Sequence, residues 1–269
     1  MPDTTNSSRS VIAKLASTST GGLFSLDDAV DALGTPRAET SRKLSTLVRT
    51  GWITRIRRGV YAIRPLESLP GTPIATDDSW TVAMRVFAPC YIGGWTAAGH
   101  WGLTEQLFRS TLVVSRRPMR RSETTVGGNV YRVVKDRRTT TSGLKVVWRS
   151  NARVLVSDIE RTLLDACAYP DWIAGGGMLA SAFLAAVAEN LVTPANLLRA
   201  ARHAPSGAAL GRLGVLIDRF LPAAEPARRF CAKNRGTGYV RFDPSIDRNG
   251  SLSTRWGVWL NVRLPEGSE

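Results

Sequence analysis

Cationic and hydroxyl side chains gather in the first quarter of the chain, where carboxylates are scarce. Residues 40–66 contain seven Lys and Arg and no Asp or Glu. Guanidinium and ammonium groups bind phosphate oxygens, and arginine also pairs in a two-pronged manner with the edge of guanine. Residues of these types at this density predict binding to a polyanion.

A second basic block covers residues 109–153, with twelve Lys and Arg against two acids. The formal charge of +14 is concentrated in the two blocks, because from residue 154 onward thirteen bases nearly balance eleven acids. Such concentration fits a polyanionic partner, although an arginine-rich coding bias would also raise the net charge. The second block either extends a DNA contact or neutralises an acidic partner. Its candidate residues are Arg116, Arg117, Arg120, Arg121, Arg137 and Arg138.

The sequence has few residues in the patterns that catalysis or metal binding requires. The chain has two histidines, His100 and His203, and three widely separated cysteines, which form neither a zinc spacing nor an even disulfide set. We expect His100 to pack within its aromatic segment. No nucleophile elbow and no phosphate-binding glycine loop is present. We therefore predict no catalytic residue, no metal and no cofactor, and a protein that is not an enzyme.

One group of carboxylates, Asp158, Glu160 and Asp165, could suggest a metal cluster. The spacing of Ser157 and Glu160 is that of a helix capping box, and Asp165 follows Arg161 by four residues. We therefore expect capping and ion pairing from these carboxylates rather than metal binding.

Three helices are expected to position the first basic block. Apolar residues at helical spacing predict helices over residues 8–16, 25–34 and 36–51. Ser25 can cap the second helix, and Thr35 followed by proline can start the third. The second and third helices are separated by only a few residues, which is typical of a helix-turn-helix.

Two short strands follow the helices. Residues 52–56 and 59–63 alternate between apolar and polar types, and Arg57 and Arg58 lie at the turn between them. Three helices and a basic hairpin predict a winged helix-turn-helix. Winged helices also serve as protein-interaction modules, but the absence of acids from helix and wing favours DNA.

Helical geometry divides the third helix into two faces. Leu44, Leu47 and Val48 form the apolar face, and about 100° per residue places polar side chains opposite. Glu39 on this helix repels phosphates unless it accepts a hydrogen bond from a cytosine amine. The expected base contacts are Arg37, Ser41 and Arg42. The other expected DNA contacts are Lys43, Ser45, Thr46 and Arg49 on the helix, mainly to phosphates, and Arg55, Arg57 and Arg58 on the wing. From the wing tip, Arg57 and Arg58 are expected to reach phosphates or the neighbouring minor groove.

The rest of the chain predicts a larger mixed α/β body. Helical segments and β-type runs are interspersed after residue 80, and the proline- and glycine-rich residues 65–73 look like a joint. The expected fold class is α+β, with a winged helix-turn-helix over residues 1–68 and an α/β domain over residues 74–269. No apolar run is long enough to span a bilayer, so we expect a cytoplasmic protein without a membrane partner.

Several motifs in order resemble the AbiEi-type antitoxins. They are the N-terminal winged helix, YIGGWTAAGHWGLTEQ at residues 91–106, VSDIERTLLDACAYP at residues 156–170, and a final segment with Asp243-Pro244, Trp256 and Asn261. The resemblance implies a transcriptional autorepressor from a bacterial abortive-infection system. It further implies an N-terminal domain that binds inverted repeats in its own promoter and a C-terminal domain that counters a nucleotidyltransferase toxin, with or without direct contact.

The alternative hypothesis is an enzyme that processes nucleic acid and uses the winged helix to hold its substrate. A metal-dependent nuclease needs clustered carboxylates, and the second basic block nearly lacks them. A third hypothesis, an effector-sensing regulator, requires a ligand pocket that the sequence does not identify. The oligomeric state stays open, because palindromic operators are served equally by a dimer or by two monomers.

Overall fold

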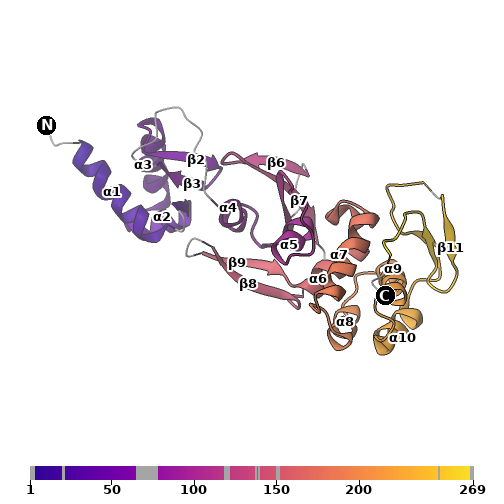
Figure 1. The fold of residues 1–269 in the computed structure, drawn as a ribbon. Helices are drawn as coiled ribbons and strands as arrows, with labels where there is room; N and C mark the ends of the chain where they lie inside the picture. Colours follow the sequence, from indigo (N-terminus) through magenta and orange to yellow (C-terminus); the bar gives the residue numbers. More distant parts are fainter. Residues whose placement is uncertain are drawn as a thin grey trace. The chain divides into compact units, whose positions relative to one another are not determined.

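The computed structural model describes residues 4–19, 22–64, 78–117, 122–136, 138, 140–149, 152–247 and 249–266 (Figure 1). Its helices and several separate sheets confirm the α+β class. The chain forms two compact units. Unit 1 comprises Met1–Tyr91, Val113–Asp136 and Val146–Leu155, and unit 2 comprises Ile92–Leu112, Arg137–Lys145 and Val156–Glu269. The predicted division at residues 68–74 falls outside the described residues and stays a prediction.

The N-terminal part of unit 1 has the elements of a winged helix. They are α1 (Thr4–Thr18), β1 (Leu23–Ser25), α2 (Leu26–Leu33), α3 (Arg37–Arg49), β2 (Ile53–Arg57) and β3 (Val60–Ile63). The three strands form an antiparallel sheet in the order β1-β3-β2. The sequence predicted the helices and the hairpin, but not β1, because three residues are too few for an alternating pattern.

Local sequence explains where these helices begin and end. Ser25 and Asp28 form a reciprocal capping box at the start of α2, and Gly34 ends the helix in the left-handed conformation. The predicted start of α3 is wrong by one residue. Pro36 is the N-cap, and the Thr35 hydroxyl bonds to Thr40 Oγ1 instead of capping the helix.

The apolar core of this region joins all three helices to the sheet. Leu15 from α1, Leu44 and Leu47 from α3, and the stacked rings of Phe24 and Tyr61 lie at its centre. The stripe predicted on α3 is thus buried, with Thr40 added to it. Burial of this face leaves the opposite face of α3 to solvent.

A six-stranded mixed sheet follows, in the order β6-β7-β5-β4-β9-β8. The strands are β4 (Cys90–Ile92), β5 (Ser110–Ser115), β6 (Glu123–Val126), β7 (Asn129–Lys135), β8 (Leu144–Arg149) and β9 (Ala152–Ser157), with helices α4 (Ser79–Val86) and α5 (Gly94–His100) between them in the chain. β4 and β9 are parallel, and β6 and β7 are antiparallel. The sequence predicts strands from its β-type runs at residues 111–115, 129–134, 145–148 and 153–156, and these runs lie in β5, β7, β8 and β9.

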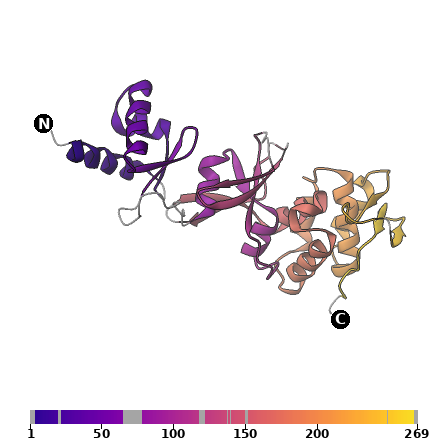
Figure 2. The same ribbon diagram turned by 90° about the horizontal axis from the view of Figure 1, so that it is seen from above.

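The last part of unit 2 is mainly helical (Figure 2). Its helices are α6 (Ile159–Ala168), the 3-10 turn η1 (Pro170–Ile173), α7 (Gly176–Ala188), α8 (Pro194–Ala201), α9 (Gly207–Phe220) and α10 (Glu225–Asn234). A small sheet of β10 (Val240–Arg241), β12 (Val258–Leu260) and β11 (Ser251–Ser253) follows. The buried face of α9 packs against α6, α7 and α10, and forms the centre of this core.

None of the described helices combines the length and apolar character needed to cross a membrane.

Candidate nucleic-acid interface

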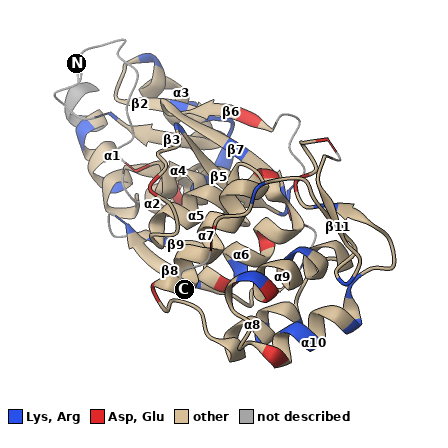
Figure 3. Ribbon diagram, turned by 45° about the vertical axis from the view of Figure 1, so that its right-hand side comes forward, with Lys and Arg blue, Asp and Glu red and all other residues tan. Residues whose placement is uncertain are grey.

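The face of α3 opposite its buried stripe carries the predicted contact side chains. Figure 3 shows Lys and Arg, coloured blue, along this helix. Thr40, Leu44 and Leu47 are buried, whereas the polar positions between them are exposed or half-buried. Exposed are Arg37, Arg42, Ser45, Thr46 and Arg49, and half-buried are Ser41 and Lys43. The structure therefore brings these seven residues together on one solvent-facing helix.

Two of the cations on α3 already have carboxylate partners. Arg37 pairs with Asp27 of α2, and Lys43 Nζ lies 2.8 Å from Glu39 Oε1. The hydrogen bond and the charge of Lys43 lower the pKa of Glu39. Glu39 is therefore held by a lysine one turn away, and this pairing offsets part of the repulsion that it would exert on a phosphate.

Arg42 and Arg49 differ from these two residues. Both side chains are exposed, and neither forms an ion pair with a carboxylate in the described part of the chain. Arg42 also lines a shallow hollow of about 340 Å³ between α1 and α3, with Val11 and Leu47 among its apolar walls. These two arginines are the α3 cations most available for an outside partner.

The wing arginines have unequal environments. Arg55 and Arg58 are exposed, and Arg58 lies in the turn before β3. Arg57 is the last residue of β2, next to an irregularity in register, and its Nε is buried without a hydrogen-bond partner in the described residues. Burial, and then the nearby charge of Arg117, lowers the pKa of Arg57. Arg58 is thus the better candidate for an exposed cation at the tip of the wing, whereas Arg57, one residue earlier, is half-buried.

The predicted second basic surface is only partly described. Arg116 and Arg117 are exposed directly after β5, and the Arg116 amide donates to Pro89 O at 3.2 Å. Arg57 of the first basic block and Arg117 of the second are close enough within unit 1 for their charges to interact. Arg120, Arg121 and Arg137 lie outside the described residues.

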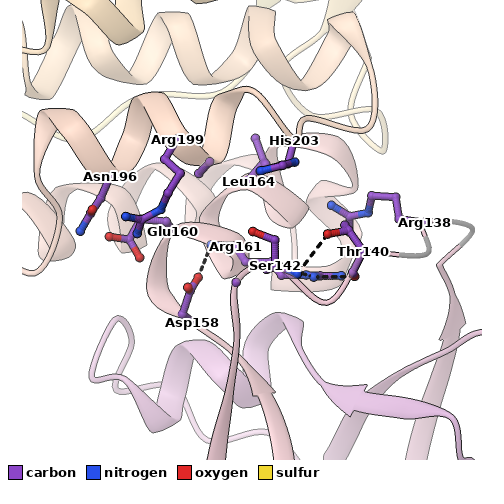
Figure 4. Close-up of a pocket in the computed structure, with 12 residues that line it drawn as sticks. Arg138, Thr140, Ser142, Asp158, Glu160, Arg161, Leu164, Asn196, Arg199 and His203 are labelled. Carbon is purple, nitrogen blue, oxygen red and sulfur yellow. Dashed lines mark hydrogen bonds between the residues drawn. The ribbon is translucent and has the colours of Figure 1, made fainter.

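Unlike Arg116 and Arg117, Arg138 lies in unit 2, where it lines a small pocket of about 100 Å³ (Figure 4). Its guanidinium pairs with the buried carboxylate of Asp165. Arg161 donates to Thr140 O and Ser142 O, and its Nε lies 3.7 Å from Asp165. The two arginines tie the segment after β7 to α6.

Asp158 and Asp165, two of the three carboxylates near the start of α6, have structural partners. Asp165 pairs with Arg161 as expected. The predicted capping box is wrong, because Asp158 is the N-cap and accepts from the Arg161 amide at 2.8 Å. Ser157 instead bonds through its hydroxyl to Thr162 Oγ1 at 2.7 Å. No group of three or more metal-ligating side chains occurs within the residues that the structure describes.

The motifs behind the family resemblance mainly support the fold. Trp101 Nε1 donates to Ser157 O at 2.7 Å, and His100 lies against the Trp101 ring, with 4.5 Å between the ring centroids. Asp243 accepts from the Gly176 amide at the start of α7. Asn261 accepts from the Asp243 amide and donates to Asp243 O. These residues hold the C-terminal core together.

Comparisons with known proteins agree with this arrangement. The crystal structure of the RV2827C protein from Mycobacterium tuberculosis is similar in fold, with a TM-score of 0.58 and 18% sequence identity over 94% of this chain and 90% of that chain. A search of curated proteins found no match. The family described as "Transcriptional regulator, AbiEi antitoxin" matches residues 11–64, which run from α1 to the end of the wing. Residues 11–64 are therefore similar to the AbiEi-antitoxin transcriptional regulators, as the resemblance predicted.

Proposed function

We propose that this protein is a DNA-binding transcriptional autorepressor and the antitoxin of a bacterial toxin–antitoxin pair. The observation that carries the proposal is the exposed cationic face of α3 within the region that matches the AbiEi family. A helix with one buried face and cations on the other can enter a major groove without disturbing its own core. Inverted repeats in the protein's own promoter are the proposed operator.

The contacts divide by position along α3 and the wing. Arg37, Ser41 and Arg42 lie in the N-terminal half of the helix, which is the part that reads base edges in helix-turn-helix proteins. To contact a base, Arg37 must break its ion pair with Asp27 and form hydrogen bonds to the DNA instead. Phosphates are left to the residues that follow on the helix and wing, namely Lys43, Ser45, Thr46, Arg49, Arg55, Arg57 and Arg58.

In this proposal the C-terminal body counters a nucleotidyltransferase toxin encoded next to it and performs no catalysis itself. The test is co-expression with the adjacent nucleotidyltransferase reading frame, where the full chain should restore growth. A chain carrying Arg42→Ala should still restore growth, because α3 serves the operator. A neighbourhood without such a toxin, or a toxin that the chain fails to counter, contradicts the antitoxin assignment.

The repressor assignment is tested by binding to the upstream DNA, measured by fluorescence anisotropy at several salt concentrations. If about six phosphates are neutralised, log K should fall with log salt at a slope near −5. Arg229→Ala is the matched control, because this arginine is exposed on α10, outside the family match. Affinity that is insensitive to salt, or equal loss from Arg42→Ala and the control, rejects the proposal.

A further inference from the structure

The strand β8 carries an exposed tryptophan that the α3 interface does not use. The structure describes all eight tryptophans, and Trp148 alone among them is largely exposed, with 66% of its surface accessible. Val146, two residues earlier, is 41% exposed. Alternate residues of a strand share a face, so these two side chains form one apolar face at the edge of the six-stranded sheet.

The other face of β8 is occupied. The Arg149 guanidinium lies 4.4 Å from the centre of the buried Trp80 ring, within unit 1. A cation over an aromatic face fixes the side of the strand on which Arg149 lies. Trp148 must therefore point away from α4, to the opposite side of the strand.

The neighbouring strand adds a cation to the exposed face. Along β9, buried Ala152, Val154 and Val156 alternate with exposed Arg153 and half-buried Leu155. Strand alternation places Arg153 and Leu155 together on the face of β9 that is not packed in the core. The open face is thus an aromatic ring with one aliphatic neighbour on each strand, Val146 and Leu155, and the exposed cation of Arg153 beside them.

The size and charge of this face select its occupant. A stable protein interface buries about 800 Å² on each partner around an apolar centre, far more than one ring and two aliphatic side chains supply. A second copy of the chain would bring arginine against arginine. One nucleobase, in contrast, needs one ring to stack on and a cation for its phosphate.

We propose that the exposed face of β8 and β9, formed by Val146, Trp148, Arg153 and Leu155, binds single-stranded nucleic acid by stacking an unpaired base on Trp148, with Arg153 on the adjacent phosphate. This surface is separate from the α3 interface and takes a different form of nucleic acid. Both RNA and DNA offer the required base and phosphate.

The experiment measures binding of the full chain to fluorescein-labelled oligo-dT and oligo-rU of twelve nucleotides, by anisotropy at low salt. Stacking on an aromatic side chain predicts that Trp148→Ala weakens binding roughly tenfold, whereas Trp148→Phe keeps most of it. Arg153→Ala should reduce the salt slope by about one. Preference for oligo-rU would identify RNA as the source, and equal binding would identify single strands of either kind.

Arg42→Ala is the control that separates this proposal from the repressor assignment. It should leave single-strand affinity within about twofold while weakening duplex operator binding, and Trp148→Ala should do the reverse. Absence of single-strand binding by the wild-type chain overturns the proposal, as does equal affinity of wild type and Trp148→Ala. A dimer in analytical ultracentrifugation that Trp148→Ala dissociates would also overturn it, because the face would then join two copies.

Discussion

Arginine has opposite uses in two regions of this molecule. On α3, Arg42 and Arg49 extend into solvent from a helix whose other side is buried. In the C-terminal core, Arg161 and Arg212 are 5% and 4% exposed and donate to backbone carbonyls. Net charge alone does not distinguish these uses. A formal charge of +14 therefore overstates the cations that an outside partner can reach.

Arg212 is the clearest case of an inward-facing cation. Its Nε and Nη2 donate to Arg241 O, and its Nη1 donates to Cys167 O at 2.8 Å. Burial lowers the pKa of Arg212, partly opposed by the neighbouring Cys167 and Asp243. The guanidinium here serves as a rigid multiple donor that joins α9, α6 and β10.

The largest effect is expected from Arg212→Ala. The change leaves two carbonyl groups without their donor and opens a cavity, so unfolding free energy should fall by about 3–5 kcal/mol. Urea unfolding measures this loss. Arg219→Ala on the same helix is the control, because its exposed side chain predicts a change within about 0.5 kcal/mol. If both variants lose the same free energy of unfolding, buried and exposed arginines do not differ in their contribution to stability.

Gly214 of α9 provides the next test, since the core around Arg212 is closely packed. A Cβ at this position would lie 2.1 Å from a Trp256 ring carbon, and the ring Nε1 donates to Asp218 at 2.6 Å. Gly214→Ala should therefore cost about 1–3 kcal/mol through overpacking. Gly177→Ala in α7 has open space at its Cβ and should stabilise by up to about 1 kcal/mol. The melting temperature should fall for Gly214→Ala and stay the same or rise for Gly177→Ala. A lower melting temperature for both variants would contradict the packing argument.

On the α3 side, Arg42→Ala should cost about 1–3 kcal/mol of operator binding and relax the sequence preference. Arg58→Ala should weaken binding to all duplexes alike, because a phosphate contact carries no base information. Competition with shuffled operator sequences measures the difference. If both variants change sequence preference equally, the proposed division between helix and wing is wrong.

A smaller, pH-dependent effect is expected at Asp243. Burial alone would raise its pKa, but hydrogen bonds from Ser245 and the Gly176 amide outweigh burial and lower the pKa. The stabilisation is therefore present above the unfolded pKa near 3.9 and is lost as pH falls through the lower folded pKa. Asp243→Asn should cost about 1–2 kcal/mol at pH 6 and less at pH 3. If the difference in unfolding free energy between wild type and Asp243→Asn grows as the pH falls, the pKa of Asp243 is not lowered by folding.

Patterns that act over a few residues predicted much of the fold. Apolar spacing identified α2, α3 and the wing strands, and the cap at Ser25 followed from local hydrogen-bonding chemistry. The four strands from β5 to β9 that have apolar runs were also predicted. In contrast, β6 (Glu123–Val126) has a polar sequence, and its position depends on pairing with β7.

Long-range partners limited what could be predicted of the candidate site. The sequence grouped Arg138 with Arg116 and Arg117, but Arg138 pairs with Asp165, 27 residues away. Likewise, Arg57 and Arg58 are adjacent in the chain but differ in burial, since Arg57 is the last residue of β2 and Arg58 lies in the turn that follows. The exposed Trp148 was not singled out. The sequence did contain a signal for it, because Trp148 lies between Lys145 and Arg149 in a predicted strand.

The bond between Asp243 and the Gly176 amide joins groups 67 residues apart in the chain. At about 5–20 residues per second, a ribosome needs roughly 3–13 s to synthesise the intervening segment. During that time α7 lacks the acceptor at its first turn, and the Asn261 side chain that steadies Asp243 arrives later still. A nascent chain therefore cannot complete the hydrogen bonds at the first turn of α7 until residues as far as Asn261 have been synthesised.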